Sequence, residues 1–265
     1  MRVGQVFRYS RPYRSSPNEI DGLVNFFYAT SSIDCKKVLL DAGINKPTLV
    51  SSSDGKRESV LLLRSSSHKI GTEDTPWQDY FDPDHGHVRY FGDNKNRSAP
   101  TSPENSRGNS ALLKQFDLHS SNKKTDRLLA APILCFSSTP FNGKAKGAVK
   151  FEGFGLINKA ERIVQYDRRT DTTFTNYVYD ILIFDMSSED EIFDWSWITA
   201  RRNKNLSVTE CLKYAPSSWK KWVEGGESVL REVKRSVSKL MTTKTRDQRP
   251  TSTKEITLLR SIYNY

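Results

Sequence analysis

Residues 75–95 read TPWQDYFDPDHGHVRYFGDNK, a segment in which aromatic side chains alternate with charged and turn-forming ones. The run from Asp82 to Gly86 has the composition of a tight turn, because Pro presets the backbone while Asp and Gly favour turn geometries. Strand-type residues follow from His87 to Phe91, and a second turn is indicated from Gly92 to Lys95. The segment therefore predicts a β-hairpin with a polar loop beyond its second strand.

Further strands are predicted before and after this hairpin. Runs rich in β-branched and aromatic residues indicate strands over residues 59–64, 132–136, 147–155 and 177–185. Few long helices separate these runs, which is typical of a curved sheet or barrel, and Gly153 and Gly155 suit a tight bend in it. We expect an α+β fold built on a curved, barrel-like sheet.

Helical patterns surround the predicted strands. The sequence predicts a helix over 107–116 with Asn109 or Ser110 as its N-cap, and helices over 18–29, 32–42, 207–214, 216–224 and 227–241. Residues 242–254 are polar, basic and interrupted by Pro, as in a linker. We expect a mixed segment over 1–54 packed on a core over 55–200, a basic helical part over 201–241, and over 242–265 a linker with the start of a missing C-terminal domain.

The charge is uneven along the chain. The net charge is +10, and residues 201–265 hold 15 Lys and Arg against 6 Asp and Glu. Such an excess favours a polyanion partner, although a solvated basic tail would explain it equally well. Three scattered Cys without metal-type spacing, no long apolar run and no signal peptide together predict a soluble cytoplasmic protein that does not bind a membrane.

Several segments together resemble one known family. They are the opening segment with RGNSALL (107–113), RLLAAPILCFS (127–137), GAVKFEGFGL (147–156), FTNYVYDILIFD (174–185), FDWSWITARR (193–202) and APSSWKKWVEGG (215–226). Most of residues 55–245 is similar to the N-terminal domain of AspBHI-type restriction endonucleases. That resemblance implies a domain like the SET- and RING-associated (SRA) domain, which binds methylcytosine, followed by a nuclease domain of the PD-(D/E)XK class. It also implies cleavage of DNA that contains 5-methylcytosine.

The order of two short motifs also resembles SRA domains. An aromatic-x-Gly strand end, Tyr90 to Asp93, precedes an Asn-x-Ala-Leu helix start at Asn109. In that family an Asp accepts a hydrogen bond from the cytosine amino group while aromatic rings enclose the flipped base. Carried over to this sequence, the resemblance implies Asp93 as the acceptor and Tyr90 or Phe91 as a stacking wall.

The same segment has a physical interpretation as a base pocket. A protein that encloses a whole base must extrude it from the duplex, which costs a few kcal/mol, and each aromatic partner returns about 1–3 kcal/mol. A carboxylate that accepts from the amino group favours cytosine over thymine. The predicted pocket residues are Trp77, Tyr80, Phe81, Tyr90, Phe91, Gly92, Asp93 and Asn94. Ordinary core packing of the aromatics and turn capping by Asp93 and Asn94 are the alternatives.

A second set of residues is basic and fits phosphate contacts. Its members are Lys95, Arg97, Arg107, Lys144, Lys146, Arg168, Arg169, Arg201, Arg202, Lys220 and Lys221. For each of them a solvated surface position is the alternative. The expected partner is double-stranded DNA with a modified cytosine, together with a nuclease domain in the same polypeptide; multimers are common among such nucleases, so self-association is a further expectation.

No metal or cofactor is predicted for this chain, and Mg²⁺ is expected only for the missing nuclease domain. His85 and His87 lack a third ligand at matching spacing. We therefore expect DNA binding without cleavage.

One rival function is that of a module that reads hydroxymethylcytosine, phosphorothioate or unmodified sequence. Another, of a different class, is a self-contained metal-dependent nuclease using the acidic residues from Asp180 to Asp194.

Overall fold

The structure is a computed structural model. It describes residues 1–9, 18–30, 38, 40–47, 49–65, 79–94, 102–144, 147–167 and 171–237. The predicted helix over 32–42 falls mostly outside these residues, and the predicted linker over 242–254 does so entirely.

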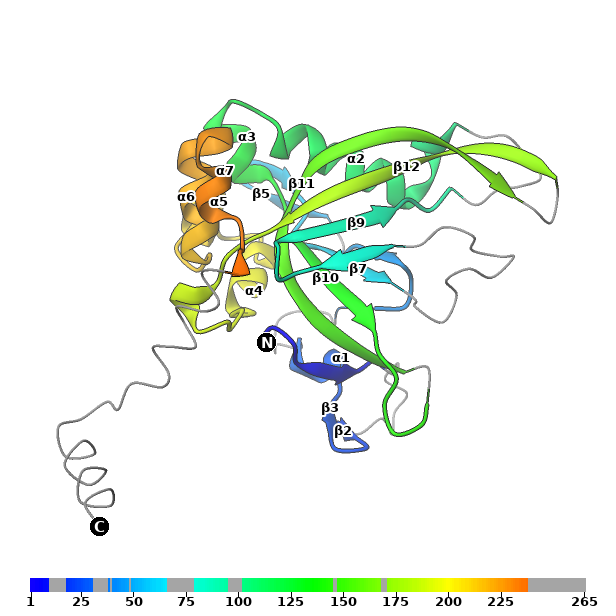
Figure 1. The fold of residues 1–265 in the computed structure, drawn as a ribbon. Helices are drawn as coiled ribbons and strands as arrows, with labels where there is room; N and C mark the ends of the chain where they lie inside the picture. Colours follow the sequence, from blue (N-terminus) through cyan, green and yellow to red (C-terminus); the bar gives the residue numbers. More distant parts are fainter. Residues whose placement is uncertain are drawn as a thin grey trace, which may run out of the picture.

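An eight-stranded sheet forms the centre of the molecule (Figure 1). Its order is β4 (Ile44–Asn45), β7 (Leu61–Ser65), β10 (Ile133–Ser138), β11 (Ala148–Asp167), β12 (Thr172–Ile183), β9 (His87–Phe91) and β8 (Tyr80–Asp82), with β1 (Val6–Arg8) paired to the first part of β11. β7 and β10 run parallel, whereas the other pairs of this sheet are antiparallel. The four strands predicted around the hairpin and the strand His87–Phe91 are confirmed.

The sheet curls until its two ends approach each other. Tyr90 on β9 donates from its hydroxyl to the carbonyl oxygen of Arg64 on β7 at 3.3 Å, although three strands separate β7 from β9 in the sheet order. Within the described residues, β4 and β8 form no backbone ladder with each other. The α+β fold with a curved sheet is therefore confirmed, as an open half-barrel instead of a closed barrel.

Glycines allow the curvature of the twenty-residue strand β11. Gly153 has φ +126°, a backbone conformation that suits glycine, and the register with β10 shifts beside it. At Gly155 a Cβ atom would overlap the Leu182 carbonyl group of β12. The bend predicted at these two glycines is confirmed.

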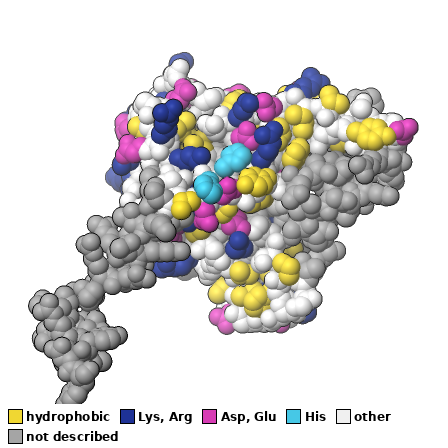
Figure 2. All heavy atoms as spheres, viewed as in Figure 1, with side chains coloured by type: hydrophobic (Ala, Val, Ile, Leu, Met, Phe, Trp, Pro, Cys, Tyr) yellow, Lys and Arg dark blue, Asp and Glu magenta, His cyan; other side chains and the backbone are white. Residues whose placement is uncertain are grey.

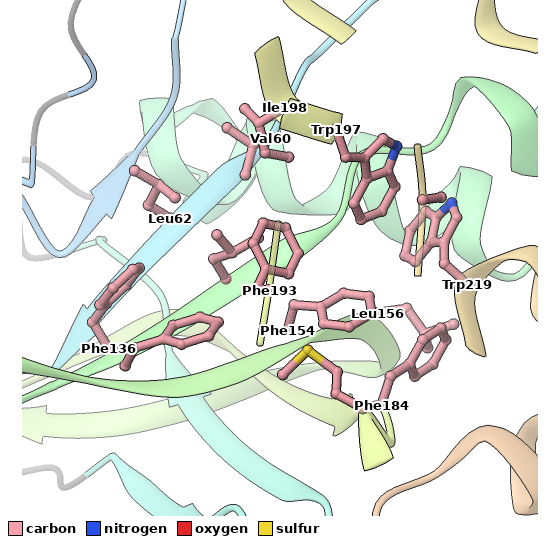
Figure 3. Packing of buried hydrophobic residues seen from close by; sticks show 14 of the residues in the cluster. Val60, Leu62, Phe136, Phe154, Leu156, Phe184, Phe193, Trp197, Ile198 and Trp219 are labelled. Atoms are coloured by element: carbon pink, nitrogen blue, oxygen red, sulfur yellow. The ribbon is translucent and has the colours of Figure 1, made fainter. Parts of the chain in front are cut away.

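The convex side of the sheet carries an aromatic core. Figure 3 shows Phe154, Phe184, Phe193, Trp197 and Trp219 packed against one another. The core is covered by the helices α4 (Ser196–Arg202), α5 (Val208–Leu212), α6 (Ser217–Gly225) and α7 (Leu230–Val233). The predicted basic helical part thus packs directly on the sheet as far as Val233, which is buried.

A second core fills the inside of the half-barrel. It contains Leu63, Val88, Tyr90, Ile133 and Tyr179, and α2 (Arg107–His119) packs into it through Ala111 and Leu112. α3 (Lys124–Leu129) follows α2 and leads into β10. α2 is the predicted helix over 107–116, but it begins two residues before the predicted cap Asn109.

Two other helix predictions are wrong. The segment after Asn18 first forms the hairpin of β2 (Glu19–Ile20) and β3 (Leu23–Val24), and the short α1 (Phe26–Ala29) begins after Asn25, whose side chain accepts from the Phe27 amide. In place of the predicted helix over 227–241, the described residues up to Ser236 form a 3₁₀ turn, Gly226–Val229, the short α7 and an extended stretch, and residues 238–241 lie outside the described ones.

Residues 234–236 are extended, and this stretch pairs with the sheet. The Asp185 amide donates to the Val233 carbonyl oxygen, and the Arg235 amide donates to the Ile183 carbonyl oxygen. The Arg235 side chain is buried and forms an ion pair with Glu191 at 2.6 Å. These contacts replace the helical hydrogen bonds that the apolar periodicity predicted.

A small hairpin of β5 (Val50–Ser52) and β6 (Gly55–Arg57) precedes β7. A 3₁₀ turn, Pro103–Asn105, precedes α2, and another, Ser187–Glu189, follows β12.

In the described part of the chain, no helix has the length and apolarity needed to cross a membrane.

Candidate nucleic-acid interface

The start of the loop after β9 is fixed by the side chains of three buried Asn residues. Gly92 donates to the Tyr177 carbonyl oxygen at 2.8 Å and accepts from Asn176 Nδ2 at 3.0 Å. Asn94 is buried, and its Nδ2 donates to the Thr175 carbonyl oxygen at 2.7 Å. Asn176 in turn accepts from Asn109 Nδ2 at 3.1 Å. β9, β12 and α2 thus converge on residues 92–94, which we call the Gly92 turn.

Asp93 binds the beginning of α2. Its Oδ2 accepts from the Gly108 amide at 2.8 Å, and its Oδ1 accepts from the Asn109 amide at 2.9 Å and from the Ser106 hydroxyl at 2.5 Å. The first amides of a helix have no partners within the helix, and a carboxylate there is also favoured by the helix dipole. Asp93, which follows β9, therefore caps the start of α2 instead of its own turn.

Close packing at the Gly92 turn requires glycine on both sides. A Cβ atom on Gly92 would overlap the Asn109 side chain, and one on Gly108 would lie 2.6 Å from the Asp93 carboxylate. Both glycines therefore permit the strand end and the helix start to touch.

The predicted pocket aromatics point to two sides of the sheet. Tyr90 is buried in the inner core, and Phe81, whose register partner is Val88, packs against the same core. Tyr80 is 52% exposed, and its ring lies 6.2 Å from that of His87 on the outer side. Phe91 is two residues beyond Arg89, the register partner of Tyr80, so it also faces outward. The predicted aromatic residues therefore do not line a single pocket, because side chains alternate between the two faces of a strand. Trp77, the other predicted aromatic residue, lies outside the described residues.

Asp79 lies on the inner side, next to Tyr90. It directly precedes β8 and accepts from the Phe91 amide through Oδ1 at 2.9 Å. Burial raises the pKa of Tyr90 well above its ordinary value, and the charge of Asp79 adds to this effect. The positive charge of Arg64 acts in the opposite direction on the pKa of Tyr90. The Arg64 guanidinium lies 4.7 Å from the centre of the Tyr9 ring. Asp79 lies between Trp77 and Tyr80 in the sequence, but it is not one of the predicted pocket residues.

The outer side of β8 and β9 is polar, and Figure 2 shows histidine side chains there among acidic and basic ones. His85 Nδ1 lies 2.8 Å from Asp82 Oδ1, and His87 Nε2 lies 3.4 Å from Asp180 Oδ1. Within the described residues there is no group of three or more His, Cys, Asp and Glu that could hold a metal ion. His85 instead stabilises the turn after β8.

The acidic run after β12 has structural contacts. Glu189 Oε1 accepts from the Ser217 amide at 2.8 Å, Asp185 accepts from the Ser187 hydroxyl at 2.8 Å, and Glu191 pairs with Arg235. These carboxylates join the end of the sheet to α6 and to the segment after α7.

Comparison with known proteins identifies the family. A family model described as restriction endonuclease AspBHI N-terminal matches residues 1–234. The chain belongs to this family. No curated protein sequence matches the chain.

Solved structures agree with this AspBHI N-terminal assignment. The MspJI restriction endonuclease, solved in complex with a 27-mer oligonucleotide, is 38% identical with a TM-score of 0.81, and the match covers 89% of this chain and 54% of the MspJI chain. This chain thus spans about half the length of MspJI.

Two more distant structures share the fold. The DNA recognition domain of the cytosine modification-dependent restriction endonuclease LpnPI is 16% identical with a TM-score of 0.58, covering 89% of this chain and 90% of that one. The DNA modification-dependent restriction endonuclease AspBHI is 19% identical with a TM-score of 0.59, covering 89% and 52%. The SRA-like fold class expected from the sequence is in agreement with these matches.

The basic residues predicted to bind phosphates are spread over several elements of this AspBHI N-terminal domain. Arg107 is exposed at the start of α2, and Lys144 is exposed before β11, where it pairs with Asp21 at 3.6 Å. On α6, Lys220 is half-buried and Lys221 pairs with Glu232 at 2.6 Å. Arg202 is half-buried on α4. The remaining predicted residues that lie outside the described ones are Lys95, Arg97, Lys146, Arg168 and Arg169.

The prediction that Arg201 binds a phosphate is wrong. Its side chain is buried, and its guanidinium donates to the carbonyl oxygens of Ser59 at 3.0 Å, Glu58 at 2.9 Å and Ala130 at 2.8 Å. Burial lowers the pKa of Arg201 to about 10, which still leaves it charged at neutral pH. Arg201 therefore ties α4 to the strands and cannot reach a phosphate.

Proposed function

We propose that this chain recognises 5-methylcytosine, or a closely related modified cytosine, in duplex DNA by base flipping. In this proposal it is the specificity domain of a modification-dependent restriction endonuclease that acts in the cytoplasm. The main support for the proposal is the 38% identity to MspJI over 89% of the chain. The fold that the chain shares with the DNA recognition domain of LpnPI adds to it.

Because the second core fills the inside of the half-barrel, we place the extruded base at its rim, where Asp79 directly precedes β8. Tyr90 provides a buried aromatic ring beside the Asp79 carboxylate. A carboxylate accepts from the cytosine amino group, whereas thymine presents a carbonyl oxygen at that position. Aromatic stacking worth about 1–3 kcal/mol per base offsets the cost of extrusion.

The structure changes which acid we assign to that role. Asp93 uses both carboxylate oxygens on α2. Asp79 is on the same side as Tyr90 and follows Trp77 by two residues. We therefore assign the cytosine contact to Asp79 and the positioning of α2 to Asp93.

The recognition test is a binding series with four matched duplexes that carry cytosine, 5-methylcytosine, 5-hydroxymethylcytosine or a phosphorothioate at one position. We expect binding to the methylated duplex at least about tenfold tighter than to the plain one at 0.15 M salt, equivalent to about 1.4 kcal/mol. Equal binding to both would overturn the proposal. Preference for another modification would identify that modification as the ligand instead.

Base extrusion is tested separately. A duplex with 2-aminopurine next to the modified cytosine should become more fluorescent on binding, because its stacking neighbour leaves the helix. Unchanged fluorescence at saturating protein would contradict base flipping while leaving modification-dependent binding intact.

Catalysis is assigned to a Mg²⁺-dependent nuclease domain outside these 265 residues. The described acidic residues support this assignment because they bind backbone amides, a hydroxyl group and Arg235. The 265-residue chain should bind modified DNA without cutting it in the presence of Mg²⁺. Cleavage that disappears in Asp185→Ala would favour the self-contained nuclease. Self-association of the complete enzyme stays a prediction.

A further inference from the structure

A cleft of about 570 Å³ lies along α2, between this helix, the end of α3 and the β5–β6 hairpin. Leu118 on α2, Leu129 on α3 and Leu49 before β5 give it an apolar lining, and Leu49 is 46% exposed. Volumes of 300–1,000 Å³ are typical of ligand sites in proteins.

The charges around this cleft are strongly unequal. Five cations line it, namely Lys46, Lys56, Arg57, Arg107 and Lys114, against the single carboxylate of Glu58. A concave surface with an excess of one charge concentrates ligands of the opposite charge. The cleft, which we call the α2 cleft, therefore favours an anion.

Two of the five cations have structural roles. Arg57 is buried and donates to the carbonyl oxygens of Arg201, Asn203 and Leu206. Lys46 lies 3.7 Å from Glu58. Burial raises the pKa of that carboxyl group, and the charges of Lys46 and Lys114 act on it in the opposite direction.

The other three cations are available. Lys56, Arg107 and Lys114 are exposed, and no ion pair of theirs is found in the part of the chain that the structure describes. Arg107 and Lys114 are seven residues apart, two turns of α2, and so point to the same side about 10 Å from each other. One DNA strand carries a phosphate every 3.4 Å along the helix axis, so this length spans about three phosphates.

The α2 cleft begins next to the Gly92 turn. Asp93 holds the amides of Gly108 and Asn109, so Arg107 is the residue that immediately precedes the anchored start of the helix. From there the cleft follows α2 to Leu118, away from the turn. A DNA strand that enters the recognition site could therefore continue along the same helix.

We propose that the α2 cleft binds the sugar-phosphate backbone of the DNA that flanks the modified base. Lys56, Arg107 and Lys114 neutralise phosphates on its rim, and Leu49 and Leu118 contact the apolar faces of the deoxyribose rings. This inference rests on the proposed function and adds a sequence-independent contact to it, because backbone contacts position DNA without reading bases.

The test is the double variant Lys56→Gln/Lys114→Gln of the 265-residue chain. Its matched control is Lys213→Gln/Arg231→Gln, which removes the same charge from exposed positions at the end of α5 and on α7, outside the residues that line the cleft. Binding to methylated and plain 20-bp duplexes is measured from 0.05 to 0.3 M salt. Thermal unfolding of both variants is recorded to show that they fold.

Each phosphate contact contributes about 0.9 to the slope of log K against log salt. We expect the α2-cleft variant to lower this slope by about 1.8 and to weaken binding about tenfold at 0.1 M salt, equally for both duplexes. The control should keep the wild-type slope. The modified-to-plain affinity ratio should stay unchanged in both variants.

Several results would overturn the inference. These are an unchanged slope, an equal loss in the control, or a loss confined to the methylated duplex. Unchanged DNA binding combined with weaker association to a nuclease domain would show that the α2 cleft docks protein instead. If the wild-type chain does not distinguish the two duplexes, the proposed function fails, and the difference in slope still decides whether the α2 cleft binds DNA.

Discussion

Asp93 and Asn109 are hydrogen-bonded in both directions. The Asn109 amide donates to Asp93 Oδ1 at 2.9 Å, and the Asp93 amide donates to Asn109 Oδ1 at 3.2 Å. The pair has the reciprocal form of a capping box, with its two halves sixteen residues apart on a strand end and a helix start. The position of α2 is therefore fixed relative to the Gly92 turn.

Replacing Asp93 should reduce stability before it affects recognition. Asp93→Asn removes the charge at the start of α2 and one of the acceptors for the Gly108 and Asn109 amides. Loss of a helix cap costs about 0.5–2 kcal/mol. We expect a loss of about 1–2 kcal/mol in the free energy of unfolding in urea, with the modified-to-plain DNA affinity ratio maintained. If the variant is as stable as the wild type but binds modified and plain DNA equally, Asp93 contacts the base after all.

Replacing Asp79 should reduce the recognition of methylated DNA but change the stability of the fold little. Asp79→Asn keeps an oxygen for the Phe91 amide, so the fold should change little. The second carboxylate oxygen becomes an NH₂ donor that cannot accept from the cytosine amino group, so this contact is lost, at about 1.4 kcal/mol or a tenfold change. Fluorescence anisotropy should show about tenfold weaker binding to methylated DNA and unchanged or slightly tighter binding to plain DNA. An unchanged ratio would exclude Asp79 as the cytosine contact.

Arg201 is expected to be essential for folding. Arg201→Gln leaves the carbonyl groups of Ser59, Glu58 and Ala130 without their donor in a buried position. A buried acceptor left without a donor costs about 1–3 kcal/mol, so the loss over the three carbonyl groups should reach about 3 kcal/mol or more. Chemical unfolding should show this loss. The same charge change on the half-buried neighbour, Arg202→Gln, should cost less than about 1 kcal/mol.

Gly155 should tolerate no side chain. In Gly155→Ala the new methyl group would overlap the Leu182 carbonyl group, so β11 and β12 must separate. We expect a loss of more than about 3 kcal/mol, or no folded protein. Gly143→Ala is the control, because a Cβ atom there meets open space and only the φ of +71° opposes it, at about 1 kcal/mol. Equal losses would show that the close strand approach is unimportant.

His119 should make the protein less stable in mild acid. It is buried on α2, where Nε2 donates to the Ala131 carbonyl oxygen at 2.9 Å and Nδ1 accepts from the Ile157 amide at 3.2 Å, an arrangement that requires the neutral ring. Burial lowers its pKa to about 3 from the ordinary 6.5. The unfolded chain therefore binds the proton more readily, so the stability that His119 contributes is complete above pH 6.5 and is lost as the pH falls towards 3.

The measurement is the free energy of unfolding at pH 7, 6 and 5. We expect the wild type to lose about 2 kcal/mol between pH 7 and pH 5 through this residue. His119→Gln is the control variant, since it has no titrating ring and should show a flatter profile although it is less stable at pH 7. Identical pH profiles would show that His119 is not the responsible group.

Strands were predicted well because local composition and burial agree. Residues 61–63 are all Leu, the run Tyr177 to Ile183 is apolar or aromatic except for Asp180, and both runs lie on internal strands of the sheet. Gly153 and Gly155 were recognisable as a bend because a strand interior rarely contains two glycines. These signals act over a few residues, so they are visible in a single sequence.

Other features depend on distant contacts and could not be predicted in the same way. Lys234 and Arg235 lie in a run with helical apolar periodicity, but they pair with the end of β12 and the residue after it. Arg201 stands next to Arg202 in the sequence and looks like a surface cation. In the structure it is buried and donates to the carbonyl oxygens of Glu58 and Ala130. Asp93 lies in a polar turn that suggests a ligand contact, and the start of α2 fourteen residues later takes its carboxylate. In each case the partner is supplied by a different element.

The length of β11 has a consequence for how the protein comes apart. One uninterrupted backbone pairs with β1 and β10 in its first half and with β12 in its second. Peeling away either set of partners exposes the same strand, so the two ends of the sheet should melt as a single cooperative unit. In native-state hydrogen exchange, the amides of Phe136 on β10 and Tyr179 on β12 should therefore open with the same free energy.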